Sequence, residues 1–559
     1  MRTKKKSDHL TLQAIGGSHV VLLGWDYPKS KCRNLAGFAV HRIDHEEEEA
    51  GWLKGMKTFD ATDPGMPRGT LHSTRQHPVQ SFWWSDYSAK PGHDYTYKVV
   101  ALKGDPDDLK EAATTIVKVR TESPEDGLND VHFNRGITAS QEFARRFGNH
   151  RPDEEDLDHP VWAWLSRGLF EAMQAFVNAA RSGDKLRICA YEFHFVPFLK
   201  VVKEAVDRGV DVKIIYDAKN KPDDDGDVFP RDANRKAVAK AGLKSKCIER
   251  AEFKSAISHN KFMVRYKRNK PVSVWTGGTN FSDGGIFGQS NVGEVCENDA
   301  IAKKYSDYWD ILATDPTGRD LRPQVDALSP TPIGKPPKGS SVIFSPRGSV
   351  DILDWYADRA VNAKDGLFMT FAFGMNDIFK DVYRNSNAKL RFALMEKIVR
   401  PMKAGPKKDA EIKAITELRR MVENIFAIGS YFRFNKFDNW AAERLTGLNS
   451  HVRFIHNKFM LIDPLSNDPI VIAGSANFSN ASTKKNDENM LITRGDKRVA
   501  DIYFGEYMRL YSHHAFREWA NKKPDFIMSS LRTDDWWTGY FGNSARSRRR
   551  AYFSGTDFS

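Results

Sequence analysis

The segment His-Asn-Lys-Phe-Met occurs twice in this chain, at residues 259–263 and again at 456–460. Each copy is followed by a short loop and then by a Gly-x-x-Asn-Phe-Ser segment, GGTNFS after the first copy and GSANFS after the second. In an extended strand, residues two apart point the same way, so the His and Lys of each copy should project together. Because two cations repel, His beside Lys is a poor metal site. Lys and Asn donors instead suit phosphate oxygens, and the imidazole can attack phosphorus or move a proton.

Two such segments facing each other would place one imidazole on each side of a single phosphorus atom. One His would act as the nucleophile, and the other would protonate the leaving oxygen. Two Lys side chains would neutralise the charge that a metal ion otherwise covers, so this hypothesis needs no metal and no other cofactor. The residues predicted to carry the chemistry are His259, Lys261, His456 and Lys458.

These residues need a scaffold with two similar halves, and the surrounding sequence predicts one. Between residues 128 and 327, continuous apolar strand segments alternate with amphipathic helical segments, which is typical of a sheet covered on both faces. A Pro-rich linker follows at 328–341, and the same order of segments returns at 342–520. The prediction is an α/β protein with two lobes, each a mixed sheet flanked by helices, forming one pseudo-symmetric catalytic unit.

The two ends of the chain differ from the lobes. Residues 1–127 contain short strand-like segments between loops rich in Gly, Pro and Asp, which predicts a β-sandwich. Within it, PGHDYTYKVVAL resembles the closing strand of a fibronectin type III domain. Residues 521–559 are expected to form a C-terminal tail, whose ARSRRR cluster is either solvated or a phosphate contact. Two aromatic clusters, FWWSDY and DDWWTGYFG, could pack in a core, anchor at a lipid interface or stack on bases.

The composition narrows the partners and the compartment. Lys and Arg number 85 against 73 Asp and Glu, and the net charge of +12 favours anionic partners such as phosphates, nucleic acid or an acidic membrane surface. A solubilising surface is the alternative. The four cysteines form no close pair, which excludes a CxxC motif and suits a reducing compartment. No run approaches the roughly 20 apolar residues of a transmembrane helix, and no signal peptide is evident. A cytoplasmic protein is expected, with peripheral membrane contact and signal-independent secretion left open.

The two motifs and their loops resemble those of the phospholipase D superfamily. Its signature is His-x-Lys, four residues and then Asp, followed by a Gly-Ser-x-Asn loop. The second copy matches the whole signature, in His456, Lys458, Asp463, Gly474, Ser475 and Asn477. The first copy departs from it twice, because Tyr266 stands in place of the Asp and Gly278 in place of the Ser. The resemblance covers residues 130–515.

The resemblance implies a covalent phosphohistidine that water or an alcohol resolves. It implies His259 as the nucleophile and His456 as the acid and base, although the order could be reversed. It implies a set of side chains that bind the phosphate, namely Lys261, Lys458, Asn280, Asn477 and Ser475. In the family an acidic residue on the next strand holds the far nitrogen of the catalytic His. The supporting set is then Glu294, Glu488 and the structural Asp463. Tyr266 is expected either to replace the missing support or to offer a phenol to the substrate.

The substrate class stays open between three hypotheses. The aromatic clusters and the two-lobed single chain favour hydrolysis of a phospholipid head group. The net charge of +12, the basic segment near 400–435 and the Arg-rich tail favour a nuclease that acts on DNA or RNA. A non-catalytic phosphate-binding module is the third hypothesis. The sequence does not decide between hydrolysis and transphosphatidylation, nor does it indicate the oligomeric state or the role of the β-sandwich.

Overall fold

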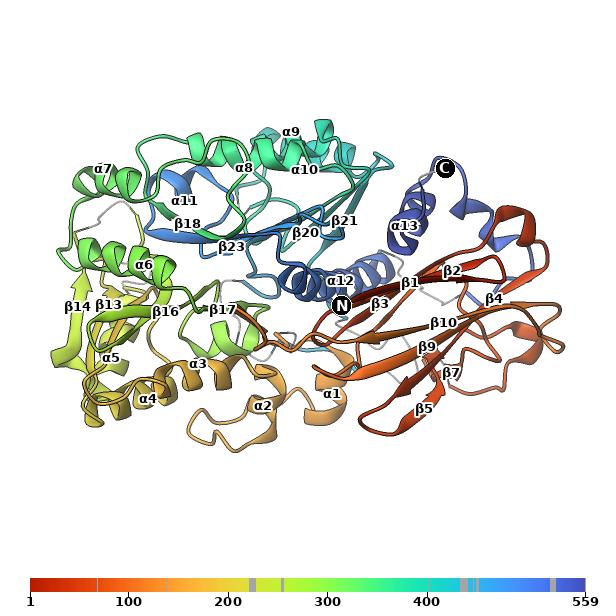
Figure 1. Cartoon of the computed structure of the whole chain (residues 1–559), viewed down its shortest axis with the longest axis horizontal. Helices are drawn as coiled ribbons and strands as arrows, with labels where there is room; N and C mark the ends of the chain where they lie inside the picture. The colour runs from red at the N-terminus through yellow and green to blue at the C-terminus, as the bar shows by residue number, and fades with distance from the viewer. Residues whose placement is uncertain are drawn as a thin grey trace.

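Figure 1 shows the computed structural model of the chain, with an all-β region at one end and two α/β lobes beside it. The structure describes residues 1–67, 69–136, 138–220, 228–252, 256–400, 402–432, 441–445, 447–448, 452–522 and 529–557. Among these residues, no helix combines the length and the apolar stretch needed to cross a bilayer.

The N-terminal region consists of two antiparallel four-stranded sheets with strand orders β1-β2-β3-β8 and β10-β9-β4-β5. Side chains from both sheets, among them Trp25 and Phe38, share one buried core, as in a β-sandwich. The strands are β1 Arg2–Ser7, β2 Leu10–Gly16, β3 Val21–Asp26, β4 Leu35–Asp44, β5 Glu49–Trp52, β8 Trp83–Asp86, β9 Asp94–Lys103 and β10 Lys110–Arg120, with a small β6 Lys54–Gly55 and β7 His72–Ser73 pair. The likeness to a fibronectin type III domain remains a prediction.

The first lobe is a mixed seven-stranded sheet of order β11-β17-β16-β15-β12-β13-β14. Its central strands are buried on both faces, which explains their continuous apolar sequence. The strands are β11 Asn129–Phe133, β12 Lys185–Ala190, β13 Asp211–Asp217, β14 Cys247–Arg250, β15 Lys261–Lys267, β16 Lys270–Gly277 and β17 Val292–Cys296. The helices are α1 Gln141–Phe147, α2 Pro160–Ser166, α3 Leu169–Asn178, α4 Val196–Asp207, α5 Arg231–Lys240, α6 Asp299–Leu312 and α7 Gly318–Leu328.

The second lobe repeats this plan with the order β18-β24-β23-β22-β19-β20-β21. Its strands are β18 Gly339–Ser345, β19 Gly366–Phe371, β20 Leu390–Met395, β21 Asn424–Ile428, β22 Phe459–Ile462, β23 Ile470–Gly474 and β24 Glu488–Arg494. Its helices are α8 Asp351–Val361, α9 Asp377–Asn385, α10 Pro406–Leu418, α11 Asn480–Lys484 and α12 Lys497–Asn521. Part of the expected linker is therefore strand, because β18 already begins at Gly339.

The two sheets also share their register, so positions can be matched one by one. Met263, four residues after His259, faces Ile188 on β12. Met460, four residues after His456, faces Met369 on β19. The last residues of β12 and β19 are therefore equivalent, and both strands end beside the two HNK segments. Helix α12 contacts strands of both lobes and of the sandwich, and Figure 1 places it between these three parts.

Residues 529–557 form a C-terminal strap that completes the sandwich. Helix α13, Ala545–Ser554, lies against β3, and the ring of Phe553 stacks on Trp83 with centroids 5.3 Å apart. Both tryptophans of the DDWWTGYFG cluster and Phe82 of the FWWSDY cluster are buried in the sandwich core, whereas Trp83 and Trp84 are half-buried and Tyr87 is 39% exposed. Core packing, the first of the three alternatives, therefore accounts for most of these aromatic side chains.

The ARSRRR cluster on α13 is not a freely solvated run. Arg550 is only 4% exposed and forms an ion pair with Asp26 of β3. Arg548 pairs with Glu423, beside β21 of the second lobe. Side-chain pairs of this kind hold the strap to two parts of the molecule, so the expectation of a solvated tail was wrong for these two residues.

Candidate active site

Each HNK segment lies at the start of a central strand, with its His in the preceding loop. Lys261 is the first residue of β15, and Lys458 directly precedes β22. The ammonium group of each Lys donates a hydrogen bond to the carbonyl oxygen of the His two residues earlier, at 2.7 Å from Lys458 to His456. The side chain of each Lys is therefore tied to the backbone of the His in its own copy.

The two lobes exchange backbone hydrogen bonds around the histidines. Ser258, just before the first His, forms a parallel bridge with Asp487 of the second lobe. Ser290 of the first lobe forms the equivalent bridge with Ile455, just before the second His. The backbone N–H of His259 donates to the Asp487 carbonyl at 3.0 Å. These bridges bring both HNK segments to the interface between the lobes.

Each His is also held by a side chain of the opposite lobe. His259 Nδ1 lies 2.8 Å from the carboxylate of Glu488. His456 Nδ1 lies 2.9 Å from the side-chain oxygen of Asn291, whose amide group donates to the Gly285 carbonyl at 2.7 Å. Because that donation turns the Asn291 oxygen toward the imidazole, His456 donates from Nδ1. His259 also donates from Nδ1, because the Glu488 carboxylate can only accept. Both Nε2 atoms therefore remain for the substrate.

Glu294 does not have the predicted role. Its carboxylate accepts a hydrogen bond from the hydroxyl of Tyr503 on α12, not from a histidine. The strand register gives the reason: Gly277 faces Gly293 on β17, and Gly474 faces Met490 on β24. Counting back two residues from Gly293 and Met490 makes Asn291, not Glu294, the equivalent of Glu488.

The sequence did contain a signal for Asn291. It lies 14 residues after Gly277 (291 − 277), as Glu488 lies 14 residues after Gly474 (488 − 474). The prediction matched residue type, an acid on the next strand, where it should have matched spacing from the glycine of the loop. Glu488 itself occupies the predicted place.

The site is buried, and burial sets its protonation. Desolvation, and then the charges of the two lysines, lower the pKa of His259 and of His456 well below the usual 6.5, so both imidazoles are neutral near neutral pH. Desolvation likewise lowers the pKa of Lys261 to about 8 and that of Lys458 well below its usual range. Burial raises the pKa of Glu488 to about 7. An anion bound between these groups would restore charge to the lysines.

The predicted phosphate-binding asparagines differ from Ser475 in their contacts. The side-chain oxygens of Asn280 and Asn477 are buried and accept no hydrogen bond within the described ranges. The Ser475 hydroxyl, in contrast, accepts from the backbone N–H of Asn489 at 3.0 Å. Ser475 therefore ties its loop to β24. In the first lobe, Gly278 packs tightly, because a β-carbon there would lie 3.3 Å from the Asn291 side-chain oxygen.

Tyr266 and Asp463 both have structural contacts. Asp463 accepts hydrogen bonds from three consecutive backbone N–H groups before β19, those of Lys364, Asp365 and Gly366, at 2.7–3.0 Å from its Oδ1. Tyr266 is buried and donates to Ser306 on α6 at 2.6 Å. The phenol thus connects β15 to the covering helix, in agreement with a supporting role and not with a contact to substrate.

One further aromatic side chain, not predicted from the sequence, lies against the first His. The ring centroid of Tyr191, which follows β12 directly, is 5.0 Å from that of His259. The ammonium nitrogen of Lys261 lies 5.1 Å from the centroid of the same ring. Tyr191 therefore forms a wall of the site and holds both groups of the first HNK segment.

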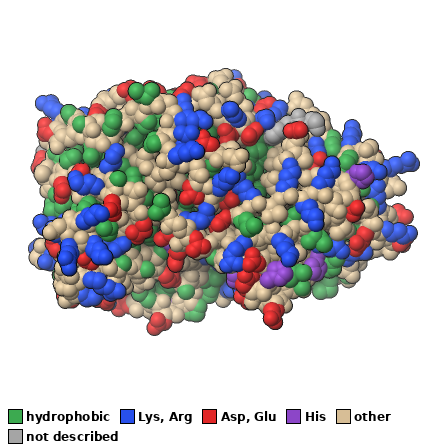
Figure 2. Space-filling view, in the orientation of Figure 1, with side chains coloured by type: hydrophobic (Ala, Val, Ile, Leu, Met, Phe, Trp, Pro, Cys, Tyr) green, Lys and Arg blue, Asp and Glu red, His purple; other side chains and the backbone are tan. Residues whose placement is uncertain are grey.

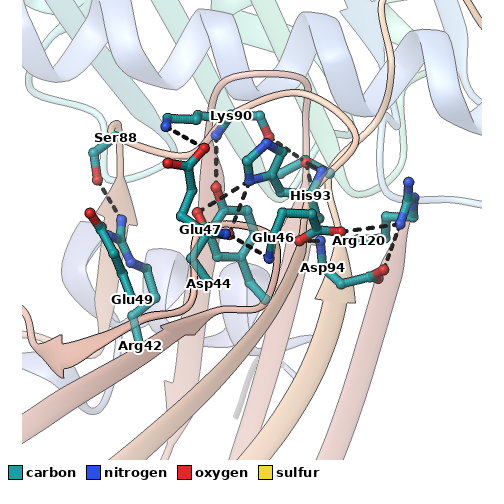
Figure 3. A network of polar contacts seen from close by, with 12 residues as sticks. Arg42, Asp44, Glu46, Glu47, Glu49, Ser88, Lys90, His93, Asp94 and Arg120 are labelled. Atoms are coloured by element: carbon teal, nitrogen blue, oxygen red, sulfur yellow. Dashed lines mark hydrogen bonds and ion pairs between the residues drawn. The ribbon is translucent and has the colours of Figure 1, made fainter.

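Within the described ranges, one group of side chains has the spacing of metal ligands, and it lies in the sandwich. Ligand atoms of Asp44, Glu46 and His93 lie within 4.8 Å of one another. Figure 3 shows that each already has a protein partner: His93 Nδ1 contacts Asp44 at 3.0 Å, and Arg120 pairs with Glu46. These contacts join the β4–β5 turn to β9, which is a structural role sufficient to explain the cluster.

Comparisons with known proteins connect this geometry to a family. Residues 174–312 and 388–508 match the family model described as "Cardiolipin synthase, PLD-like domain", and these segments include both HNK motifs. Comparison with curated proteins gave no match.

Among solved structures, the chain is similar to phosphatidylserine synthase of Haemophilus influenzae Rd KW20, with 11% identity, a TM-score of 0.43, and coverage of 64% of this chain and 89% of that one. It is also similar to polyphosphate kinase of Porphyromonas gingivalis, with 10% identity, a TM-score of 0.38, and coverage of 81% of this chain and 70% of that one. Yeast tyrosyl-DNA phosphodiesterase is a third similar structure, with 11% identity, a TM-score of 0.34, and coverage of 57% of this chain and 84% of that one. These likenesses do not decide between substrates. The matched segments, the two equivalent seven-stranded sheets and the paired motifs together lead to one conclusion: this chain contains a phospholipase D-like domain built from its two lobes.

Proposed function

We propose that this protein is a phospholipase D-type phosphodiesterase that removes a phospholipid head group through a covalent intermediate on His259. The observation that carries the proposal is the exchange of supports between the lobes, in which Glu488 orients His259 and Asn291 orients His456. Such an arrangement leaves two Nε2 atoms, one from each lobe, at a site that two buried lysines make attractive to a phosphate.

The first step is attack on phosphorus by the neutral Nε2 of His259. The P–N bond forms as the bond from phosphorus to the leaving oxygen breaks. The imidazole becomes positively charged, and a carboxylate at Nδ1 stabilises that charge more than a neutral amide does. Since Glu488 lies on His259 and only an amide lies on His456, the contacts favour His259 as the nucleophile.

His456 completes the proposed cycle as acid and then as base. A bound phosphodiester anion favours the protonated imidazole, which gives its proton to the leaving alcohol oxygen. The neutral imidazole then takes a proton from a water that attacks phosphorus. The P–N bond breaks, and His259 and His456 return to their starting states. Lys261 and Lys458 bind the phosphate oxygens throughout, a role that would otherwise require a metal ion.

The face drawn in Figure 2 gives no support to a nucleic-acid substrate, and one exposed aromatic side chain favours a lipid. Figure 2 shows Lys and Arg interspersed with Asp and Glu over the face in view, without the continuous basic stripe that a nucleic-acid backbone requires. Phe373, two residues after β19, is 45% exposed. Because it follows a strand that ends at the site, it offers an apolar contact to a lipid and to a bilayer surface. The net charge of +12 is the observation that still favours a nuclease.

The proposal is tested by incubating the protein in EDTA with phosphatidylcholine vesicles and, separately, with plasmid DNA. Release of phosphatidic acid without DNA cleavage is expected, and His259→Ala should abolish it. A phosphatidyl adduct on His259 should be seen by mass spectrometry after rapid quenching, and His456→Ala should accumulate it when the leaving group needs no proton. Cleavage of DNA alone would establish the nuclease. Binding of phosphate compounds without cleavage of either substrate would establish the binding module.

A further inference from the structure

The segment after β12 carries a carboxylate that the proposed reaction does not use. Glu192 follows Tyr191, the residue that packs on His259, and its side chain is 14% exposed. Its Oε2 accepts a hydrogen bond from Ser282 at 2.6 Å, two residues after Asn280, and lies 3.8 Å from Nε2 of His194. Its Oε1 accepts no hydrogen bond from the described part of the chain. Glu192 thus lies at the rim of the site, between the aromatic wall and the Gly-x-x-Asn loop.

The backbone around Glu192 is firmly held. Asn234 of α5 accepts from the Phe193 N–H at 2.7 Å and donates to the Tyr191 carbonyl at 2.9 Å. The N–H of Phe281 donates to the carbonyl of Glu192 itself at 3.1 Å. The carboxylate is therefore presented by a fixed segment and does not depend on a loose loop.

The fold does not require a carboxylate at this place. The shared register makes Glu192 equivalent to Phe373 in the second lobe, and Tyr191 equivalent to Ala372. The same strand end carries an acidic and an aromatic side chain in one lobe but only apolar ones in the other. The difference lies beside two HNK segments of identical sequence, so it points to the substrate, which is not symmetric.

A carboxylate at this rim opposes the binding of a simple anion. Burial lowers the pKa of Lys261 and of Lys458. The negative charges of Glu488 and, to a smaller extent, of Glu192 raise the pKa of both lysines. The same field repels the phosphate that the lysines attract. A substrate with a positive charge close to its phosphate turns this repulsion into attraction, whereas a nucleic acid or a phosphatidylglycerol does not.

We propose that Glu192, with the Tyr191 ring beside it, forms a subsite for an ammonium group on the alcohol part of the phosphodiester, as in choline and ethanolamine head groups. The inference rests on the proposed function and names its substrate class. In these head groups the nitrogen is two carbons beyond the ester oxygen, so it can reach the rim while the phosphate lies between the histidines. Carboxylates and aromatic rings are the two kinds of side chain that bind such cations.

The test compares three soluble short-chain lipids that differ only in head group: dihexanoyl phosphatidylcholine, phosphatidylethanolamine and phosphatidylglycerol. Phosphatidic acid release is followed by ³¹P NMR. Glu192→Gln should lower kcat/KM for the two cationic head groups by about 10- to 100-fold, the usual value of a charge-assisted contact, and leave phosphatidylglycerol unchanged or faster. Glu192→Lys should reverse the preference. Glu204→Gln, an exposed glutamate of α4 in the same lobe, is the matched control and should change none of the three.

The outcomes separate this inference from the proposed function. If wild type releases phosphatidic acid from none of the lipids, the proposed function fails. If wild type is active and Glu192→Gln lowers all three rates equally, Glu192 has only a structural role and the subsite does not exist. Unchanged rates for Glu192→Gln on all three lipids would overturn it as well.

Discussion

Glu488 and His259 are 229 residues apart in sequence, yet a carboxylate oxygen of the first lies 2.8 Å from Nδ1 of the second. The converse contact, from His456 to Asn291, has an amide in place of the carboxylate. Each lobe therefore orients the histidine of the other, and the two supports differ in charge. This inequality separates the roles of two histidines that lie in identical HNKFM segments.

Replacing Glu488 by Gln should lower kcat by about 10²- to 10⁴-fold, because the neutral amide stabilises a charged imidazole poorly. The matched control is Glu294→Gln. Burial raises the pKa of both carboxyls to about 7, but only Glu488 contacts a histidine. Steady-state hydrolysis of a phosphatidylcholine should remain within about twofold of wild type in the control. Equal losses in both variants would contradict the assignment of Glu488.

Asn291→Asp should raise the pKa of His456, because a carboxylate favours the imidazolium form. If His456 is the general acid, the descending alkaline limb of the kcat/KM profile should move to higher pH by about one unit or more. The variant should also lose about 1–3 kcal/mol of stability, since the Gly285 carbonyl loses its donor. Asn291→Ala provides the comparison, with lower activity and no alkaline shift. If the acid limb of the kcat/KM profile shifts instead, His456 is the nucleophile and His259 is the general acid.

The buried Glu294 should make stability depend on pH. Burial raises its pKa from 4.5 to about 7, so between these values the folded protein keeps a proton that the unfolded chain has released. Wild type should therefore lose stability as pH rises through this window, by up to about 3 kcal/mol from this group. Urea unfolding at about pH 5 and about pH 8 measures it. Glu294→Gln lacks the group, so its stability relative to wild type should improve with pH. A constant difference would show that Glu294 is ionised in the folded state.

Asp463→Ala should destabilise the second lobe by about 2–4 kcal/mol, because three backbone N–H groups lose their acceptor. Tyr266→Phe removes one hydrogen bond to Ser306 and should cost about 1 kcal/mol. Denaturant midpoints measure both effects. Both variants should hydrolyse substrate normally where they are folded. Loss of activity in Tyr266→Phe without loss of stability would show that the phenol contacts the substrate.

Gly24→Ala should loosen the C-terminal strap, residues 529–557. A β-carbon on Gly24 would overlap the backbone of Phe553 on α13, whereas a β-carbon on Gly51 of β5 meets nothing within 4 Å. Gly24→Ala should cost about 1–3 kcal/mol and expose the strap to limited proteolysis. Gly51→Ala should match wild type in both measurements, which separates the overlap from the general effect of adding a methyl group to a strand.

Local patterns in the sequence were enough to predict the lobes and the four central residues. Apolar strands between amphipathic helices repeat over a whole lobe, and His and Lys two residues apart lie within one such repeat. The partner of His456 is determined by the pairing between strands. A search by residue type therefore selected Glu294, three positions beyond the actual partner, Asn291. The Glu192 rim could not be predicted, because three segments far apart in sequence, around Glu192, Asn234 and Ser282, must fold before it exists.

The burial of Trp536 in the sandwich core has a consequence for synthesis on the ribosome. The indole nitrogen donates to the Leu35 carbonyl at 2.7 Å, 501 residues earlier in the chain. The last strand of the sandwich, β10, ends at Arg120, so 416 residues (536 − 120) separate it from this tryptophan. Their translation takes on the order of 20–80 s. Throughout that time the nascent sandwich lacks part of its core. We expect chaperones that recognise exposed apolar surface to bind this region until the last segment emerges.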